Sequence, residues 1–131
     1  MTGIVVDTNI FVAAGFNPRS ASARLISDLR EGRFLLVWNE PTRRETEMIL
    51  RRIPRLSWDG VSVLFRGEGY FDGPVDPAAF TAVVDPDDRK FAALSAAARC
   101  LLISNDAHLL DHRDALALDV LTPSAFMERD S

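Results

Sequence analysis

The sequence contains a single cysteine, Cys100, so it can form no disulfide within the chain. This argues against a disulfide-stapled secreted scaffold and favours a reducing compartment. No apolar run approaches the ~18 continuous residues of a membrane span, and the densest one covers residues 34–38. No basic residue precedes Arg19, so the charged start of a signal peptide is absent. These absences predict a cytoplasmic protein without a membrane anchor.

Basic residues are outnumbered, with 15 Lys and Arg against 19 Asp and Glu and a formal net charge of −4. A protein that coats DNA would be strongly basic, so the balance argues against that class, although a locally basic site remains open. The 131 residues fit one domain, and 47% hydrophobic residues can build its core. There is no internal repeat and no long linker, so we predict a single domain over residues 1–131.

Short apolar segments alternate with segments of helical period. Buried strands are predicted at residues 4–6, 34–38, 101–103 and 120–121. Helices are predicted at residues 21–29 before Gly32, from the cap Asn39 to 53, more weakly at 58–71, from Asp85 to 98, at 108–110 and after Thr122. Residues 72–84 are interpreted mainly as a connecting loop. The alternation predicts an α/β fold, a three-layer sandwich with a central, mostly parallel sheet.

Acidic residues stand where such a sheet places chemistry, at the carboxyl ends of its strands. Asp7 follows the first strand, Asp106 follows the strand at 101–103, and Asp85, Asp87 and Asp88 open the helix leading into that strand. Glu45 lies one turn before Ile49 and is expected to point towards the sheet. Clustered carboxylates repel unless cations intervene, and Mg²⁺ or Mn²⁺ suits oxygen ligands. Such a site suits phosphodiester hydrolysis.

Each of these acids also has a purely structural interpretation. Asp7 could form a turn, and Asp85 before Pro86 is a good helix N-cap. Asp87 and Asp88 suit a helix dipole, Glu45 could be a solvated helix acid, and Asp106 could cap the helix after it. Their common location favours the metal-site interpretation over these structural alternatives.

The same residues fall in a set of recognisable motifs, which cover essentially the whole chain in order. The segments are residues 5–12 (VVDTNIFV), 39–45 (NEPTRRE), 85–94 (DPDDRKFAAL), 102–106 (LISND) and 121–126 (LTPSAF). They resemble the four motifs and closing segment of PIN domains, the nuclease fold that includes VapC-like toxins of type II toxin–antitoxin pairs.

The resemblance implies a ribonuclease dependent on Mg²⁺ or Mn²⁺, acting as a toxin that a small antitoxin restrains, often as a homodimer. Its implied catalytic residues are Asp7, Glu45, Asp88 and Asp106, its metal ligands Asp7, Asp88 and Asp106, and its supporting residues Thr8, Asn9 and Ser104. Many relatives carry a second acid where this chain has His108, which favours one held ion over two. His108 could instead contact phosphate or simply lie in the first turn of a helix. Apart from the four catalytic acids, 15 acids and 15 bases remain, so the net charge of −4 corresponds to the predicted site.

A local excess of arginine lies between residues 43 and 66, with six arginines against three acids. Arg43, Arg44 and Arg51 are expected to contact RNA phosphates, and Trp58 or Tyr70 could stack on a base. A solvated helical face with core aromatics, or an antitoxin-docking face, are the alternatives.

Two other function classes compete with the ribonuclease. A non-catalytic PIN-like module that binds RNA or protein would be expected to have lost one or more acids, yet all four are present. An aspartyl-phosphate protein would need a second acid two residues after Asp7, where the chain has Asn9, or a lysine after a late strand, whereas Lys90 lies on a predicted helix.

Overall fold

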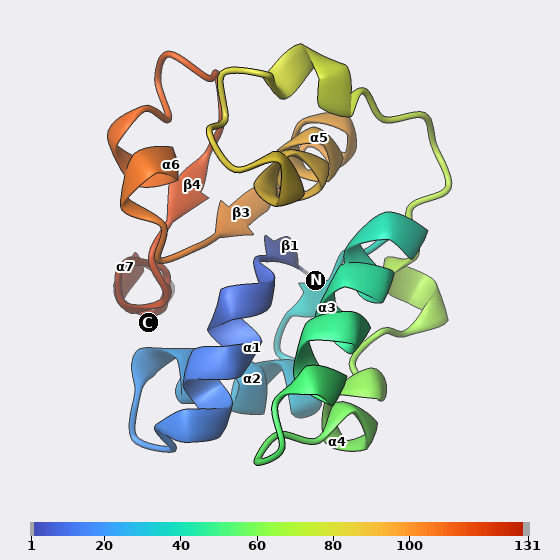
Figure 1. Ribbon diagram of the computed structural model, residues 1–131. Helices are drawn as coiled ribbons and strands as arrows, with labels where there is room; N and C mark the ends of the chain where they lie inside the picture. Colours follow the sequence, from blue (N-terminus) through green and yellow to red (C-terminus); the bar gives the residue numbers. More distant parts are fainter. Residues whose placement is uncertain (1, 130–131) are drawn as a thin grey trace.

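The computed structural model describes residues 2–129 as an α/β fold (Figure 1). The strands are β1 (Gly3–Val6), β2 (Leu35–Leu36), β3 (Leu101–Ile103) and β4 (Val120–Leu121). The α-helices are α1 (Thr8–Phe16), α2 (Ala21–Arg30), α3 (Glu40–Arg52), α4 (Trp58–Ser62), α5 (Arg89–Ala98), α6 (Ala107–Asp111) and α7 (Pro123–Arg129). The 3₁₀ helices are η1 (Gly67–Gly69), η2 (Pro77–Phe80) and η3 (Pro86–Asp88). No helix within residues 2–129 is long and apolar enough to cross a membrane.

The strands form one sheet in the order β2-β1-β3-β4, and every neighbouring pair is parallel. The register places Ile4 beside Leu36 and Leu101, and Val6 beside Ile103. Parallel neighbours need crossover connections, which the helices between the strands supply. The carboxyl ends of β1 and β3 therefore meet at one edge, and that edge carries the candidate site.

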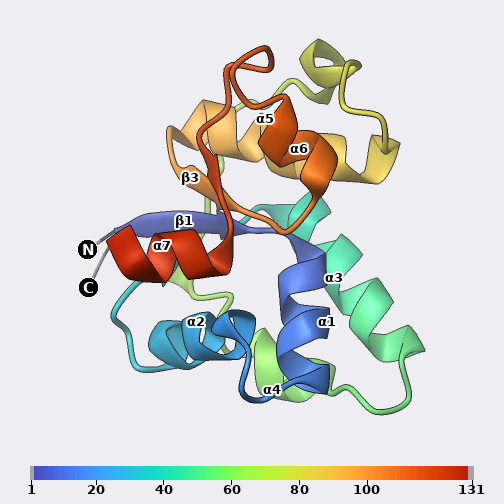
Figure 2. The ribbon, with the colours of Figure 1, turned by 90° about the vertical axis from the view of Figure 1, so that its left-hand side faces the viewer.

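Alternate residues of β1 face opposite layers of the molecule. Ile4 and Val6 pack in one core cluster with residues of α1, α2 and α7, whereas Val5 packs in a second cluster with residues of α5 and α6. Figure 2 shows the same division, with α5 and α6 on one side of the sheet and α1, α2 and α7 on the other. The predicted three-layer sandwich is confirmed, and the sheet is parallel throughout.

Two elements near the amino terminus differ from the prediction. Helix α1 was not predicted, because residues 8–16 are apolar on most sides and show no clear amphipathic period. The second strand was predicted at residues 34–38, yet β2 covers only Leu35–Leu36. Helix α2 ends before Gly32, whose φ of +79° confirms it as the helix stop.

The predicted helix over residues 58–71 is wrong for most of its length. It consists of the five-residue α4 and the short η1, and Gly67 and Gly69, at the two ends of η1, are poor helix formers. A Cβ at Gly69 would lie 1.9 Å from the Leu36 carbonyl oxygen, so glycine permits this close approach to β2. Residues 72–84 are mainly connecting chain as predicted, although they include η2 and the fully buried Val83.

Candidate active site

Asp7 lies at the point where β1 ends and α1 begins. Its backbone N–H donates to the Ile103 carbonyl at 3.0 Å, which fixes it beside the end of β3. Its carboxylate accepts from Ser104 Oγ at 2.9 Å and, as the cap of α1, from the Asn9 backbone N–H at 3.3 Å. Only 3% of Asp7 is exposed. Asp7 was predicted as a possible turn former; in the structure it caps α1 and also presents a buried carboxylate at the sheet edge.

Asp88 reaches the same edge from the start of α5. The preceding η3 is capped by Asp85, whose side chain accepts from the Asp87 N–H at 3.0 Å, as the sequence predicted. Arg89 ties this turn to the preceding chain by donating from Nε to the Val83 carbonyl at 3.0 Å. A small cavity of about 160 Å³ joins the two elements, and Asp7, Asp88 and Glu45 all line it.

Asp106 caps α6. Together with Asp7 and Asp88 it forms a cluster of carboxylates, called the acidic group below. Its carboxylate accepts from the His108 and Leu109 N–H groups at 2.8 and 3.3 Å. Its own N–H donates to Ser104 Oγ at 3.0 Å, and that same hydroxyl donates to Asp7. The fully buried Ser104 thus connects two carboxylate positions from the end of β3. The supporting role predicted for Ser104 corresponds to these contacts.

The acidic group carries more negative charge than its surroundings compensate. Burial raises the pKa of Asp7, as do the charges of Asp106 and Asp85, while the hydrogen bonds from Ser104 and Asn9 oppose the rise. Burial, the charge of Asp7 and a hydrogen bond with Asp106 together raise the pKa of Asp88 to about 7. That bond has this effect because a protonated Asp88 is the donor. A proton or a cation is therefore favoured at this edge.

Glu45 lines the same cavity, and its carboxylate is paired with a lysine. Helix α3 packs against α1 and α5, so the Glu45 carboxylate meets Lys90 of α5, with 3.3 Å between Oε2 and Nζ. The supporting residue Thr8 bonds Thr46 of α3 through their hydroxyls at 2.9 Å, which fixes α1 against α3. Lys90 was not predicted as a site residue, although it is the only lysine of the chain.

The three arginines predicted to bind RNA lie on α3, and each already has an acidic partner. Arg43 and Arg51 contact Glu47 at 3.2 and 2.8 Å, and Arg44 lies 3.8 Å from Glu40.

The predictions for the aromatic residues and for His108 have mixed outcomes. The expectation that Trp58 stacks on a base does not fit the structure, because Trp58 is 6% exposed and lies beneath the Arg43 guanidinium. Tyr70 is exposed and lies against Trp38. His108 lies in the first turn of α6, where its Nε2 is 3.3 Å from the Ala82 carbonyl oxygen.

The side chains of the acidic group are of the chemical type that binds a hard divalent cation. Asp7, Asp88 and Asp106 offer only carboxylate oxygens, the ligands that Mg²⁺ and Mn²⁺ prefer, and their mutual repulsion is what such an ion relieves. Within residues 2–129, however, no three His, Cys, Asp or Glu side chains converge as a preformed ligand set. These residues therefore have the chemical type and the position expected of metal ligands, but they do not form a complete set of ligands around one point.

The family model of the PIN domain matches residues 3–108. The chain belongs to the PIN-domain family. PIN domains are a nuclease-type fold that acts on nucleic acid and typically uses divalent metal ions. The matched range runs from β1 into α6 and includes all four candidate acids. None of the curated proteins compared with the chain matches it.

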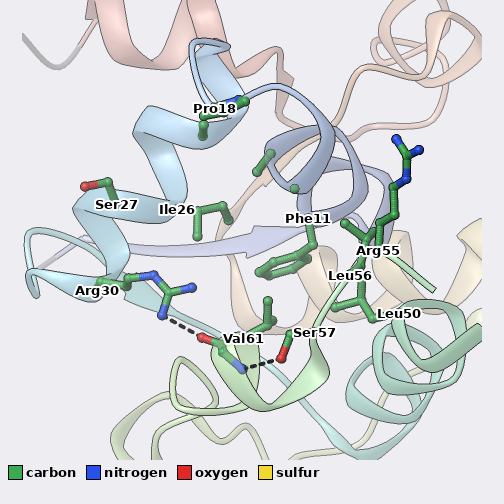
Figure 3. A pocket seen from close by; sticks show the side chains of 14 residues that line it. Phe11, Pro18, Ile26, Ser27, Arg30, Leu50, Arg55, Leu56, Ser57 and Val61 are labelled. Atoms are coloured by element: carbon green, nitrogen blue, oxygen red, sulfur yellow. Dashed lines mark hydrogen bonds between the residues drawn. The ribbon is translucent and has the colours of Figure 1, made fainter. Parts of the chain in front are cut away.

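A further cavity of this PIN domain lies away from the acidic group. Its volume is about 370 Å³, and it is enclosed by residues of α1, α2 and α4 together with the chain that joins α3 to α4 (Figure 3). Apolar side chains such as Phe11 and Ile26 form its walls, and Arg30 reaches across one side to the Gly60 carbonyl. No acidic residue lines this cavity, so it is not a candidate site for a metal ion held by carboxylates.

Proposed function

We propose that this PIN domain is an endoribonuclease that hydrolyses RNA phosphodiester bonds with Mg²⁺ or Mn²⁺. The observation that carries the proposal is the group formed by Asp7, Asp88 and Asp106 at the carboxyl ends of β1 and β3, where burial and the neighbouring carboxylates raise the pKa of Asp88. These three residues would hold the ion. When bound, a divalent ion at such a site lowers the pKa of water and stabilises the leaving oxygen of a phosphodiester.

The residues of the chain prepare this site before RNA arrives. Ser104 and the Asn9 N–H orient Asp7, while the α6 N–H groups orient Asp106. Glu45 is assigned to the catalytic group because it lines the cavity shared with Asp7 and Asp88. Burial of Asp7 keeps competing water from its carboxylate, which strengthens its attraction for a cation.

RNA binding is assigned to the exposed face of α3, through Arg43, Arg44 and Arg51. An RNA phosphate must compete there with Glu47 or Glu40, and Arg44 is the most available because it is 77% exposed with the longest ion-pair distance. We expect Arg44→Gln to weaken RNA binding in EDTA and to reduce the slope of log affinity against log salt by about 0.7. Arg19→Gln, in the turn before α2, is the matched control, and an equal loss in both variants would contradict the assignment to α3.

The biological role that we propose is that of a cytoplasmic toxin restrained by a small antitoxin, with a homodimer as its assembly. The support is the resemblance of the ordered motifs to VapC-like toxins. Expression of the chain alone should arrest growth, and Asp7→Asn should relieve the arrest. A small protein encoded beside it should co-purify with the tagged chain. Growth arrest by Asp7→Asn equal to that by the wild type would contradict the toxin role.

Cleavage of purified RNA tests the enzymatic proposal. The wild type should cut RNA in Mg²⁺ or Mn²⁺ and not in EDTA, whereas Asp7→Asn and Asp88→Asn should be inactive while keeping a wild-type circular dichroism spectrum. The proposal fails if the wild type cuts no RNA with either ion, or if Asp7→Asn stays fully active.

The second candidate is a non-catalytic PIN-like module that binds RNA or protein. The observation in its favour is that the described acids do not converge as a preformed ligand set. RNA binding that persists in EDTA, without turnover in either ion, would favour this module over the ribonuclease.

A further inference from the structure

Lys90 is the only lysine of a chain that otherwise relies on arginine for positive charge, and it lies inside the acidic site. It belongs to the first turn of α5, two residues after Asp88. Its ammonium is 3.3 Å from Glu45 Oε2, and the two side chains are only 25% and 10% exposed. This is a shielded ion pair rather than one of the solvent-exposed pairs seen elsewhere on α3.

The ion pair divides the site into two parts of different charge. Asp7, Asp88 and Asp106 repel one another, whereas Glu45 has a cation beside it. A divalent ion that took Glu45 as a ligand, even through Oε1, would stand close to the Lys90 ammonium and share one carboxylate charge with it. Two cations beside a single, largely buried carboxylate repel each other, which disfavours binding of the ion at Glu45.

On the Asp106 side of the site, the neighbouring side chain is an imidazole rather than a carboxylate. His108 stands two residues after Asp106, and its ring is engaged with the Ala82 carbonyl and lies 4.4 Å from the His112 ring. Asp85 and Asp87 also line the cavity and have no ion-pair partner among the described residues, but both are exposed. Within residues 2–129, the carboxylates of this site that are at least partly buried and not paired with a cation are therefore those of Asp7, Asp88 and Asp106.

We propose that the Lys90 ammonium takes the place of a second divalent ion: it neutralises Glu45, so that the site binds one ion and not two. This inference rests on the proposed function, since it takes Asp7, Asp88 and Asp106 as the ligands of that one ion. Lys90 is here a positioning residue that sets the number of ions through Glu45.

Counting bound Mn²⁺ tests the inference without any cleavage assay. The free ion is measured by electron paramagnetic resonance while the full chain is titrated to saturation. We expect one ion per chain for the wild type and two for Lys90→Met, which keeps the length of the side chain but frees Glu45. The double variant Lys90→Met with Glu45→Gln should return to one ion, and Lys90→Arg, which keeps the charge, should also bind one.

The outcomes separate this inference from the proposed function. One ion in both the wild type and Lys90→Met, or two in the wild type, overturns the inference and leaves the metal site standing. No ion in the wild type overturns the metal site and the inference with it. Thermal melting of each variant in EDTA confirms that the chains compared are folded, and Lys90→Gln, which also removes the charge and keeps Glu45, gives the same test if Lys90→Met fails to fold.

Discussion

Replacing Asp88 by asparagine should make the ion-free protein more stable while destroying its proposed activity. Asp88 faces Asp7, Asp85 and Asp106, and their charges together with burial raise its pKa to about 7. At pH 8 in EDTA the wild type must therefore hold Asp88 charged against its neighbours. The asparagine amide carries no charge and keeps a donor towards Asp106.

The size of the effect follows from the pKa. A rise from the ordinary 3.8 to about 7 has an upper limit of about 4 kcal/mol, because each pKa unit is worth about 1.4 kcal/mol. Asp88 is only half-buried, so solvent screening reduces the expected gain to about 1–2 kcal/mol. For a chain of this size that gain raises the melting temperature by roughly 3–8 °C.

The gain should also depend on pH with a definite sign. Because the pKa of Asp88 is higher in the folded chain than in the unfolded chain, the folded chain binds the extra proton between about pH 4 and 7. Wild-type stability from this group is fully present below pH 3.8 and is lost as the pH rises through 7. The advantage of Asp88→Asn should therefore be close to zero at pH 4 and complete at pH 8.

Thermal melts of both proteins in EDTA at pH 4 and pH 8 measure this advantage, with Asp72→Asn as the control at an exposed acid outside the site. At pH 8 with saturating Mn²⁺ the order should reverse, because the ion stabilises only the chain that binds it. A destabilised Asp88→Asn at pH 8 in EDTA, or an equal gain for Asp72→Asn, would refute the repulsion between the carboxylates.

Two further substitutions test the support of the site and of the sheet. Ser104→Ala removes the hydroxyl that donates to Asp7, so it should cost about 1–3 kcal/mol in urea unfolding and weaken Mn²⁺ binding; unchanged values of both would show that the hydroxyl does not hold Asp7 in place. Gly69→Ala places a methyl group against the Leu36 carbonyl and should lower the free energy of unfolding by about 1–3 kcal/mol. The control Gly67→Ala, whose methyl group meets nothing within 4 Å, should lower it by less than about 1 kcal/mol, and equal losses would contradict the close approach.

The sheet and its edge were predictable because their signals are local. The buried strands at residues 4–6 and 101–103 are β-branched or leucine-rich runs that end at polar residues, and parallel pairing then brings Asp7 and Asp106 to one edge. Asn39, Asp85 and Gly32 act at helix ends through their own backbone neighbours, so the sequence was enough to place them.

The missed features depend on contacts between distant segments. Residues 8–16 form α1 because they pack on α2 and α3, and no amphipathic pattern reveals this. Glu45 forms its ion pair with Lys90, which is 45 residues away in the chain. In the same way, Trp58 is buried under Arg43, although in the sequence it resembles any aromatic residue in a basic stretch.

The most direct test of the central claim is the position of Mn²⁺ in crystals of the wild-type protein grown with the ion. Anomalous scattering at the manganese edge should give one peak per chain, within coordination distance of the Asp7, Asp88 and Asp106 carboxylates, with Lys90 still beside Glu45. The absence of a peak at this edge of the sheet, with Mn²⁺ bound elsewhere or not at all, would contradict the account.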